Sequence, residues 1–172
     1  MGKVHPCLDE SLITFIHRQR CFFVATAPTS SDGYVNTSPK GYETFTIVDN
    51  HTVAYLDYPG SGNETARHIA DNGRLTIMFC GFAEDTQIVR LYGTGEVIDK
   101  GDERFGQWAD RFPERYGEWT RQIIVLHIEQ VKSSCGMSVP YYEYRGEREL
   151  LHNWAVNMED KGKLDAYIAK NK

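Results

Sequence analysis

The pattern of apolar positions predicts a short helix near the start of the chain. Leu8, Leu12, Phe15 and Ile16 recur at helical spacing, so one face of this segment is apolar. Asp9 stands where its side chain can accept a hydrogen bond from a free backbone N–H group of the first turn, which predicts that it is the N-cap. The domain is therefore expected to begin with a helix whose apolar face packs on the rest of the domain.

Segments of β type come next, and short turns rich in Gly, Asn, Asp, Ser and Pro separate many of them. They read CFFVATA (21–27), YVNTS (34–38), TFTIV (44–48), TVAYLD (52–57), RLTIMFC (74–80), TQIVRLYGTGEVID (86–99) and IIVLHIEQV (123–131). A helix is expected between the fourth and fifth of them, from Ser61. Neighbouring strands with short connections favour a mainly β fold, an antiparallel barrel of about six strands with flanking helices, over a doubly wound sheet.

The longest of these segments contains two glycines on one face. Gly93 and Gly95 share that face with Val89, Leu91 and Val97. Glycines inside a strand mark a bend or a close approach of another backbone, and a barrel requires such points.

The C-terminal part of the chain is predicted to be helical. A polar helical segment is expected at 102–111, before the last strand, and a weaker helix at 164–168. Between them an apolar stripe predicts a further helix, made of Leu150, Leu151, Trp154, Ala155 and Met158. We expect one domain over residues 1–172, with a helix and barrel in 1–144 and a helical extension in 145–172.

Composition narrows the class of protein. The formal net charge of −5 argues against a nucleic-acid partner, because such binding depends on clustered Lys and Arg. No apolar run is long enough to span a bilayer, so no membrane association is expected. The N-terminal segment MGKVHPCLDE lacks the apolar core of a signal peptide, which predicts a cytoplasmic protein.

The cysteines and histidines are scattered. Cys7, Cys21, Cys80 and Cys135 contain no C-x-x-C pair, and the six histidines form no H-x-x-x-H pair. This spacing indicates neither a zinc site nor a disulfide framework, so no metal is expected.

The segment GSGNET, from Gly60 to Thr65, has two interpretations. Ser61 and Glu64 have the spacing of a capping box, which alone would explain both residues. Alternatively, the glycines expose backbone N–H groups to an anion at a helix N-terminus, with Ser61, Asn63 and Thr65 as further donors. The segment argues against a Rossmann dinucleotide site, since the third glycine and the alternating β-α pattern are both absent.

Lys40 is the candidate cation for such an anion. It lies in VNTSPKG (35–41) at the end of a predicted strand, where Pro39 is expected to stop further ladder pairing. A lysine at a turn can equally be only a solvated charge.

Several motifs taken in order resemble the pyridoxamine 5′-phosphate oxidase-like flavoproteins, in particular a branch of FMN-binding proteins. They are FFVATA, VNTSPKG, TVAYLDYPGSGNETARHI, DNGRLTIMFC, RLYGTGEV and SCGMSVP, and the likeness extends over about residues 8–172. The resemblance implies a six-stranded antiparallel split β-barrel. It also implies a homodimer with two FMN sites in the grooves between subunits.

The resemblance also implies roles for individual residues. VNTSPK matches the strand whose backbone follows the flavin ring and whose terminal lysine approaches the phosphate, and AYLD matches the neighbouring strand. The loop GSGNET matches a phosphate-side turn in which the oxidases carry an Arg-Lys pair, whereas this chain has glycine and asparagine. The implied cofactor residues are Val35, Asn36, Thr37, Ser38, Lys40, Tyr55, Leu56, Ser61, Gly62, Asn63, Thr65 and Arg67.

Three further residues could approach the flavin. Arg90 lies near a position where the oxidases use a glutamine, although it could be an ordinary surface arginine. Cys135 and Ser138 belong to the loop SSCGMSVP (133–140), which could reach the partner's flavin. Cys135 could instead be a small buried thiol without chemistry.

The function implied is an FMN-dependent oxidoreductase that acts on an unidentified small molecule. The C-terminal basic residues that bind substrate in true pyridoxamine phosphate oxidases are not reproduced, so a vitamin B6 reaction is not expected. Two alternatives remain, a flavin carrier without a reaction of its own and the same barrel holding haem or a deazaflavin.

Overall fold

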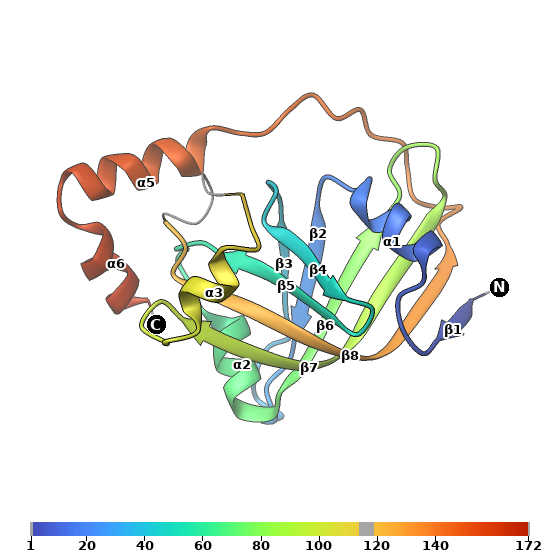
Figure 1. Ribbon diagram of the computed structural model, residues 1–172, viewed down its shortest axis with the longest axis horizontal. Coiled ribbons are helices and arrows are strands. Elements are labelled where there is room, and N and C mark those ends of the chain that lie inside the picture. The colour runs from blue at the N-terminus through green and yellow to red at the C-terminus, as the bar shows by residue number, and fades with distance from the viewer. Residues whose placement is uncertain (1, 114–118, 172) are drawn as a thin grey trace.

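The computed structural model describes residues 2–113 and 119–171, and its centre is a strongly bent antiparallel sheet with helices at its sides (Figure 1). The strands are β1 (Lys3–His5), β2 (Phe22–Thr26), β3 (Asn36–Lys40), β4 (Phe45–Asp49), β5 (Thr52–Asp57), β6 (Arg74–Cys80), β7 (Gln87–Asp99) and β8 (Gln122–Cys135). The helices are α1 (Glu10–His17), α2 (Glu64–Asn72), α3 (Phe105–Ala109), α5 (Leu150–Asp160) and α6 (Leu164–Lys170). None of the described helices has the length and apolar content needed to cross a bilayer.

The sheet runs in the order β3-β2-β6-β7-β8-β5-β4, and β1 pairs with β8 beside this path. All strand pairings among the described residues are antiparallel. Among the described residues β3 and β4 form no ladder with each other, so the curved sheet stays open. The mainly β prediction is confirmed, and seven strands coincide with the segments that the pattern marks.

The prediction of six strands is wrong, because the sheet contains eight strands among the described residues. The strand that no β-type segment marks is β1, which has only three residues and pairs with β8 opposite Val131, Lys132 and Ser133. Three residues are too short for an alternation of apolar and polar positions to show in the sequence.

Pro39 lies inside the ladder of β3 rather than stopping it. It pairs with Phe23, and Lys40 pairs with Phe22, so the expectation of a broken ladder is wrong. The reason is that β3 is an edge strand, and an edge strand tolerates a residue without an N–H group on its unpaired side.

Gly93 marks a close approach of two backbones, as predicted. The register of β7 against β8 shifts between Tyr92 and Gly93. A Cβ atom on Gly93 would collide with the carbonyl of His127 and would lie 2.9 Å from its carbon atom. At Gly95 the neighbour is a side chain, since a Cβ atom there would lie 2.9 Å from Ile69 of α2. These glycines let the sheet bend and let α2 pack on it.

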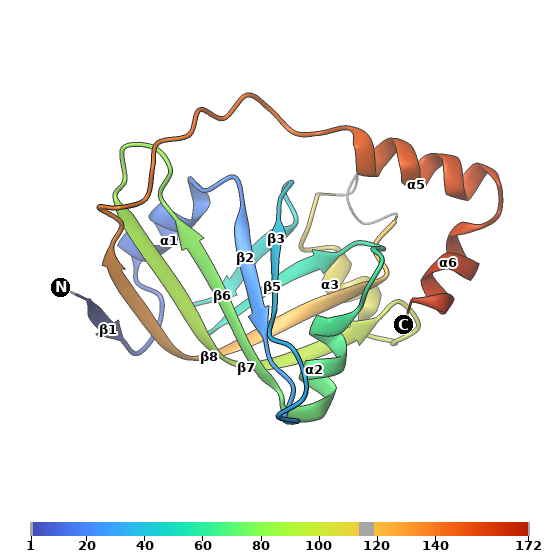
Figure 2. The same cartoon turned by 180° about the vertical axis from the view of Figure 1, so that it is seen from behind.

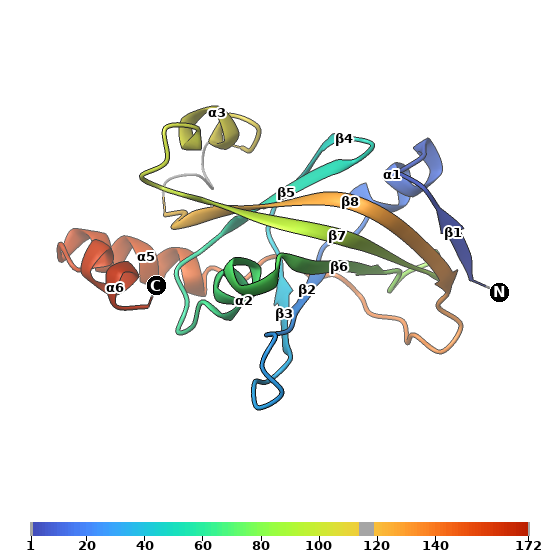
Figure 3. The ribbon, with the colours of Figure 1, turned by 90° about the horizontal axis from the view of Figure 1, so that it is seen from below.

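The main core fills the inside of the bent sheet. Helix α1 closes one side of this core with the side chains of Leu12, Phe15 and Ile16, each at most 3% exposed. A second cluster lies on the other face of β5, β7 and β8, beneath α3. Figure 3 shows α3 and α2 on opposite sides of β7 and β8.

The C-terminal helices are joined to the sheet by residues 136–149, a segment without helix or strand that we call the strap. The strap arches past the ends of β2 and β3 before α5 begins (Figure 2). In α5 the predicted stripe packs inward through Ala155, whereas Leu150 is 73% exposed and does not belong to the packed face.

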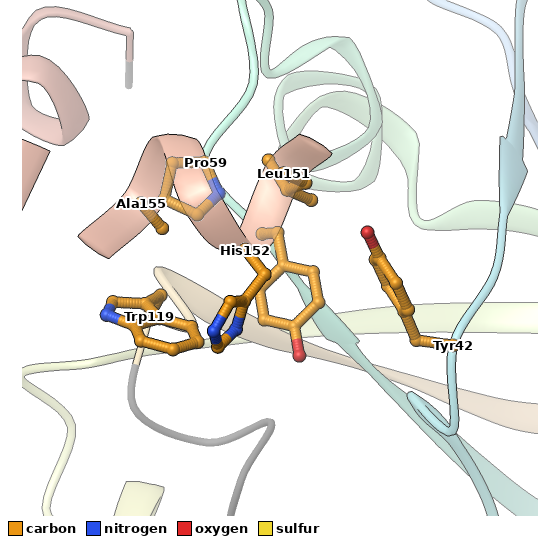
Figure 4. A pocket seen from close by; sticks show the side chains of 7 residues that line it. Tyr42, Pro59, Trp119, Leu151, His152 and Ala155 are labelled. Carbon is orange, nitrogen blue, oxygen red and sulfur yellow. The ribbon is translucent and has the colours of Figure 1, made fainter. Parts of the chain in front are cut away.

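Helix α5 docks on the barrel through Trp119. Its indole ring meets the ring of His152 edge-on at 4.6 Å, and its Nε1 donates to Glu159 Oε2 at 2.8 Å. Figure 4 shows Trp119, His152, Leu151, Ala155, Pro59 and Tyr42 around an apolar cavity of about 30 Å³. A cavity of this size holds about one water molecule, so we treat it as a packing gap rather than as a binding site.

The two predicted helix caps have different outcomes. Asp9 Oδ1 accepts from the backbone N–H of Leu12 at 2.9 Å, as predicted. The capping box at Ser61 is wrong, because α2 begins at Glu64 and its N-cap residue is Asn63, which makes no side-chain cap bond. Ser61 is exposed and lies outside the helix.

These caps give a first testable prediction. Asp9→Ala should lower the free energy of unfolding by about 1 kcal/mol, because the first turn of α1 loses its side-chain acceptor. Ser61→Ala should leave it unchanged within about 0.5 kcal/mol, as expected for an exposed residue without such a contact. Urea unfolding of both variants beside the wild type tests this, and an equal loss in the two would contradict it.

Candidate functional site

The carboxylate of Asp57 is the centre of a buried polar cluster at the end of β5. Asp57 is 1% exposed. Its Oδ1 accepts from Lys40 Nζ at 2.8 Å, and its Oδ2 accepts from Arg121 Nε at 2.9 Å and from Gln122 Nε2 at 2.8 Å. The ends of β3 and β5 and the start of β8 therefore converge on one carboxylate.

The same cluster reaches the loop before α2. Gln122 Nε2 also donates to Asn63 Oδ1 at 2.7 Å, and Arg121 Nη2 donates to the carbonyl oxygen of Gly62 at 2.9 Å. These bonds fix the position of the loop relative to β8. They also explain why the Asn63 side chain does not cap α2, since it is already used by Gln122.

One nitrogen of Arg121 is left over. Its Nη1 is buried, with the whole residue only 5% exposed, and it has no hydrogen-bond partner among the described residues. Lys40 and Arg121 carry two positive charges, and Asp57 carries one negative charge. The cluster therefore has one net positive charge and one unsatisfied donor beside the N-terminus of a helix, which is the electrostatic setting of an anion site.

The charges decide the ionisation of Asp57. Burial alone would raise the pKa of this carboxyl, but Lys40 and Arg121 outweigh burial and the pKa is lowered below its ordinary value of 3.8. Asp57 is therefore ionised at neutral pH and holds Lys40 in place.

The side chains of Tyr55 and Leu56 are too deeply buried for a flavin ring to contact them. Tyr55 is fully buried and Leu56 is 1% exposed. Burial, followed by the charge of Asp57, raises the pKa of Tyr55 well above its ordinary value. The Tyr55 hydroxyl lies near Thr65 but makes no hydrogen bond of ordinary geometry. Any contact of these two residues with a flavin would involve the backbone of β5, and their predicted roles stay predictions.

Strand β3 is tied to α2 by side chains. Asn36 Nδ2 donates to Thr65 Oγ1 at 3.0 Å, and Ser38 Oγ donates to Asn36 Oδ1 at 3.2 Å. Thr37 points outward and is exposed, and Val35, just before the strand, is 72% exposed. The predicted residues of β3 therefore line a surface that continues from the Asp57 cluster.

Glu64 occupies the N-terminus of α2. Its Oε1 accepts from Arg67 Nη2 at 2.9 Å. The pKa of Glu64 is lowered, first by a hydrogen bond to its own backbone N–H group and then by Arg67. Its carboxylate is folded over Gly62, where a Cβ atom would lie 2.7 Å from Oε1. A carboxylate thus stands where a phosphate at this helix end would be expected, and Arg67 is paired with it.

The remaining predicted residues lie elsewhere on the chain. Arg90 is on β7, where its Nη1 donates to Ser134 Oγ at 3.3 Å. Cys135 is exposed at the end of β8, so the expectation of a buried thiol is wrong. Ser138 is exposed in the turn that follows. Within the described part of the chain, no hydrogen bond or ion pair joins them directly to the Asp57 cluster.

Sequence reasoning missed Asp57, Arg121 and Gln122 as site residues. One signal was present, because an acidic residue ends an apolar strand at Asp57 and a polar pair opens another at Arg121. Polar side chains that adjoin buried strands need partners, and here they are each other's partners. Their pairing depends on the β5–β8 register, in which Asp57 stands opposite Gln122.

A large cleft borders the cluster. It has a volume of about 680 Å³ and lies between the strap on one side and the start of β2 and the end of β3 on the other. Lys40 lines it on one side, and Tyr142 and Tyr144 of the strap line it on the other. Phe82 packs against Tyr142 with ring centroids 5.3 Å apart, and Arg20 lies 5.3 Å from the Tyr144 ring centroid.

Comparison with known proteins gives a consistent result. Residues 8–135 match the family model of pyridoxamine 5′-phosphate oxidase. The pyridoxamine 5′-phosphate oxidase family protein ustO of Aspergillus flavus is 39% identical over 142 residues, which are 81% of this chain and 57% of the relative. The chain thus matches only about half of that relative's length.

Two solved structures are similar in fold. One is a putative pyridoxamine 5′-phosphate oxidase from Lactobacillus delbrueckii, with a TM-score of 0.56 and 19% identity over 74% of this chain and 94% of that one. The other is a pyridoxamine 5′-phosphate oxidase-related, FMN-binding protein from Nostoc punctiforme. It has a TM-score of 0.52 and 14% identity over 73% of this chain and 84% of that one.

Proposed function

The chain belongs to the pyridoxamine 5′-phosphate oxidase family, and on this premise we propose that it binds FMN and passes hydride or electrons between FMN and a small molecule. The observation that carries the proposal is the buried cluster of Lys40, Arg121 and Asp57 beside the N-terminus of α2. The FMN-binding protein from Nostoc punctiforme, which has a similar fold, supports the choice of cofactor.

The residues present fit a phosphate monoester. A bound anion would accept a hydrogen bond from Arg121 Nη1, which has no partner among the described residues, and would balance the net positive charge of the cluster. Backbone N–H groups of the first turn of α2 that follow Glu64 provide further donors, because the Asn63 side chain does not cap them. Lys40, Arg121 and the loop 60–65 would therefore hold the phosphate of FMN.

Strand β3 would hold the flavin ring. As an edge strand it keeps one row of backbone N–H and C=O groups that β2 does not use. Donors from Asn36 to Ser38 can bond the polar edge of a planar ring and favour negative charge on it. The exposed Thr37 and Val35 would extend this surface.

FMN supplies the capacity to accept or donate a hydride, and the chain supplies binding, orientation and the exclusion of water. Lys40 connects the two parts of the site, because it belongs to the Asp57 cluster and also lines the cleft beneath the strap. A small molecule bound in that cleft would lie beside β3, between the aromatic side chains of Phe82, Tyr142 and Tyr144.

The visible absorption spectrum of the purified protein tests this function. We expect a flavin spectrum, or the appearance of one after titration with FMN. Reduction of the bound flavin by NADH or NADPH would then support an oxidoreductase. A bound flavin that no reductant or small molecule turns over would instead indicate a carrier, and a haem or deazaflavin spectrum would overturn the choice of cofactor.

We further propose a homodimer with FMN at the subunit interface. Apolar side chains are exposed on the parts of the chain that flank the site, among them Tyr34, Val35 and Met137, at 72–90%. A second subunit would cover them and bring the loop with Cys135 and Ser138, or Arg90, to the flavin. Analytical ultracentrifugation should give about twice 19.7 kDa. A monomer with full FMN occupancy would contradict the dimer.

Glu64 gives a prediction specific to the phosphate. Its carboxylate lies where the phosphate would bind, so Glu64→Gln should tighten FMN binding by about 1 kcal/mol, or about fivefold, through the loss of like-charge repulsion. Riboflavin, which lacks the phosphate, should bind both proteins equally. Glu103→Gln, at an exposed carboxylate outside the cluster, is the matched control. Equal changes for FMN and riboflavin would place the phosphate elsewhere.

A further inference from the structure

Cys21 and Cys80 are neighbours across two strands. Cys21 immediately precedes β2, and Cys80 is the last residue of β6. These strands are antiparallel, with Phe23 opposite Met78. Continuing the same register brings Phe22 opposite Phe79 and then Cys21 opposite Cys80. The ring centroids of Phe22 and Phe79 are 5.8 Å apart, as expected if these two residues are neighbours across the strands.

Both thiols point to the same face of the sheet. Phe22 and Phe79 are buried in the core at 3% and 2% exposure, so the residue next to each of them points to the opposite face. Residues that stand opposite each other in antiparallel strands have Cα atoms about 4.5–5.5 Å apart. A disulfide needs about 4.4–6.8 Å, so the extended register would bring the two cysteines within bonding reach.

We propose that Cys21 and Cys80 form a reversible disulfide by exchange with a small-molecule disulfide such as oxidised glutathione. The Cys21 thiolate attacks one sulfur of the reagent, forms a mixed disulfide and releases one thiol. The Cys80 thiolate then attacks Cys21 and releases the second thiol. The two protein thiols are oxidised, the reagent is reduced to two thiols, and the protons from Cys21 and Cys80 end on them.

The surroundings give the order of these steps. Cys21 is partly exposed and lines the 680 Å³ cleft, so a small disulfide can reach it first. Cys80 is 7% exposed and suits the second, internal attack. Burial raises the pKa of both thiols. The neighbouring Cys80 and Glu147 raise the pKa of Cys21 further, whereas Arg90 partly offsets the effect of burial on Cys80. The exchange should therefore become faster as the pH rises towards 9.

The bond would have a consequence for the proposed cofactor site. Strand β2 lies between β6 and β3, and Lys40 is the last residue of β3. A disulfide would fix the start of β2 to the end of β6 at the wall of the cleft. The ratio of small disulfides to small thiols in solution would thus determine whether β2, the strand that supports β3, is constrained by the bond.

The experiment uses the full chain with oxidised glutathione at about pH 8.5, near the ordinary thiol pKa. We expect a product lighter by two hydrogen atoms, without attached glutathione, that dithiothreitol reverts. Trypsin separates the four cysteines into residues 4–18, 21–40, 75–90 and 133–145. The linked peptides should be 21–40 and 75–90. A link that involves Cys7 or Cys135, or no intramolecular link, would overturn the proposal.

Variants test the order of attack. Cys80→Ser should accumulate glutathione on Cys21, because the resolving thiol is absent. Cys21→Ser should react with glutathione at Cys80 at least tenfold more slowly than Cys80→Ser does at Cys21. A variant with Cys7→Ser and Cys135→Ser together is the matched control and should form the disulfide like the wild type. Failure of this control to form it would show that the bond depends on another cysteine.

Discussion

Replacement of Asp57 by asparagine is expected to lower the free energy of unfolding by about 3–5 kcal/mol. The substitution keeps the size of the side chain but removes its charge, which leaves the buried guanidinium of Arg121 without a counter-charge. Lys40 loses the same partner but is partly exposed and can turn to water. Urea or thermal unfolding followed by circular dichroism measures the loss, and failure to recover folded protein is its extreme form.

The matched control for this experiment is Asp85→Asn. Asp85 also pairs with an arginine, Arg18, at 2.8 Å, but both side chains are well exposed. Exposed pairs contribute at most about 1 kcal/mol. Equal losses in the two variants would show that the buried position of Asp57 has no special role.

The same residue predicts an acid limb of the stability curve. The pKa of Asp57 is lowered in the folded protein, so its contribution is fully present above the ordinary carboxyl pKa of 3.8. It is lost as the pH falls below that value and through the lowered pKa. Stability of the wild type should therefore fall more steeply below about pH 4 than that of Asp57→Asn.

Lys40→Ala should weaken FMN binding by about 1.5–3 kcal/mol, or about 10–150-fold, the range for a hydrogen bond to a charged group. Lys40 is the partly exposed cation of the cluster, and its ammonium group can contact a phosphate while Asp57 stays paired with Arg121. The affinity for riboflavin should change much less, because riboflavin has no phosphate. Titration of the apoprotein with both flavins, followed by fluorescence quenching, measures the difference.

Lys161→Ala controls for a general loss of positive charge. Lys161 is exposed at the end of α5, outside the cluster, and its removal should leave both affinities unchanged. If Lys40→Ala weakens FMN and riboflavin equally, Lys40 positions β3 but does not contact the phosphate.

The strands could be predicted well from the sequence because their signal is local. Runs of β-type residues mark β5 and β6 with the bounds that the structure has, and Gly93 marks the bend of β7. Helix α1 and its cap at Asp9 follow from spacing alone. Each of these features depends on a few consecutive residues.

The errors occurred where a distant residue changed a local preference. Ser61 and Glu64 have the spacing of a capping box, but Gln122 binds Asn63 and the helix begins only after it. Pro39 was expected to end a ladder, and its position on an edge strand allows it to remain. Local propensity was overruled in both places by contacts that sequence spacing does not contain.

By itself the sequence determined a mainly β protein with a helix at its start, helices at its end and a lysine and a glycine-rich loop as the elements of a candidate anion site. The tertiary structure alone decided that Asp57 and Arg121 pair beside this site, and that β2 and β6 run side by side so that the extended register brings Cys21 opposite Cys80. The physical reason is that apolar periodicity records which face of a strand is buried, whereas the partners of a buried charge or thiol are set by strand order and register.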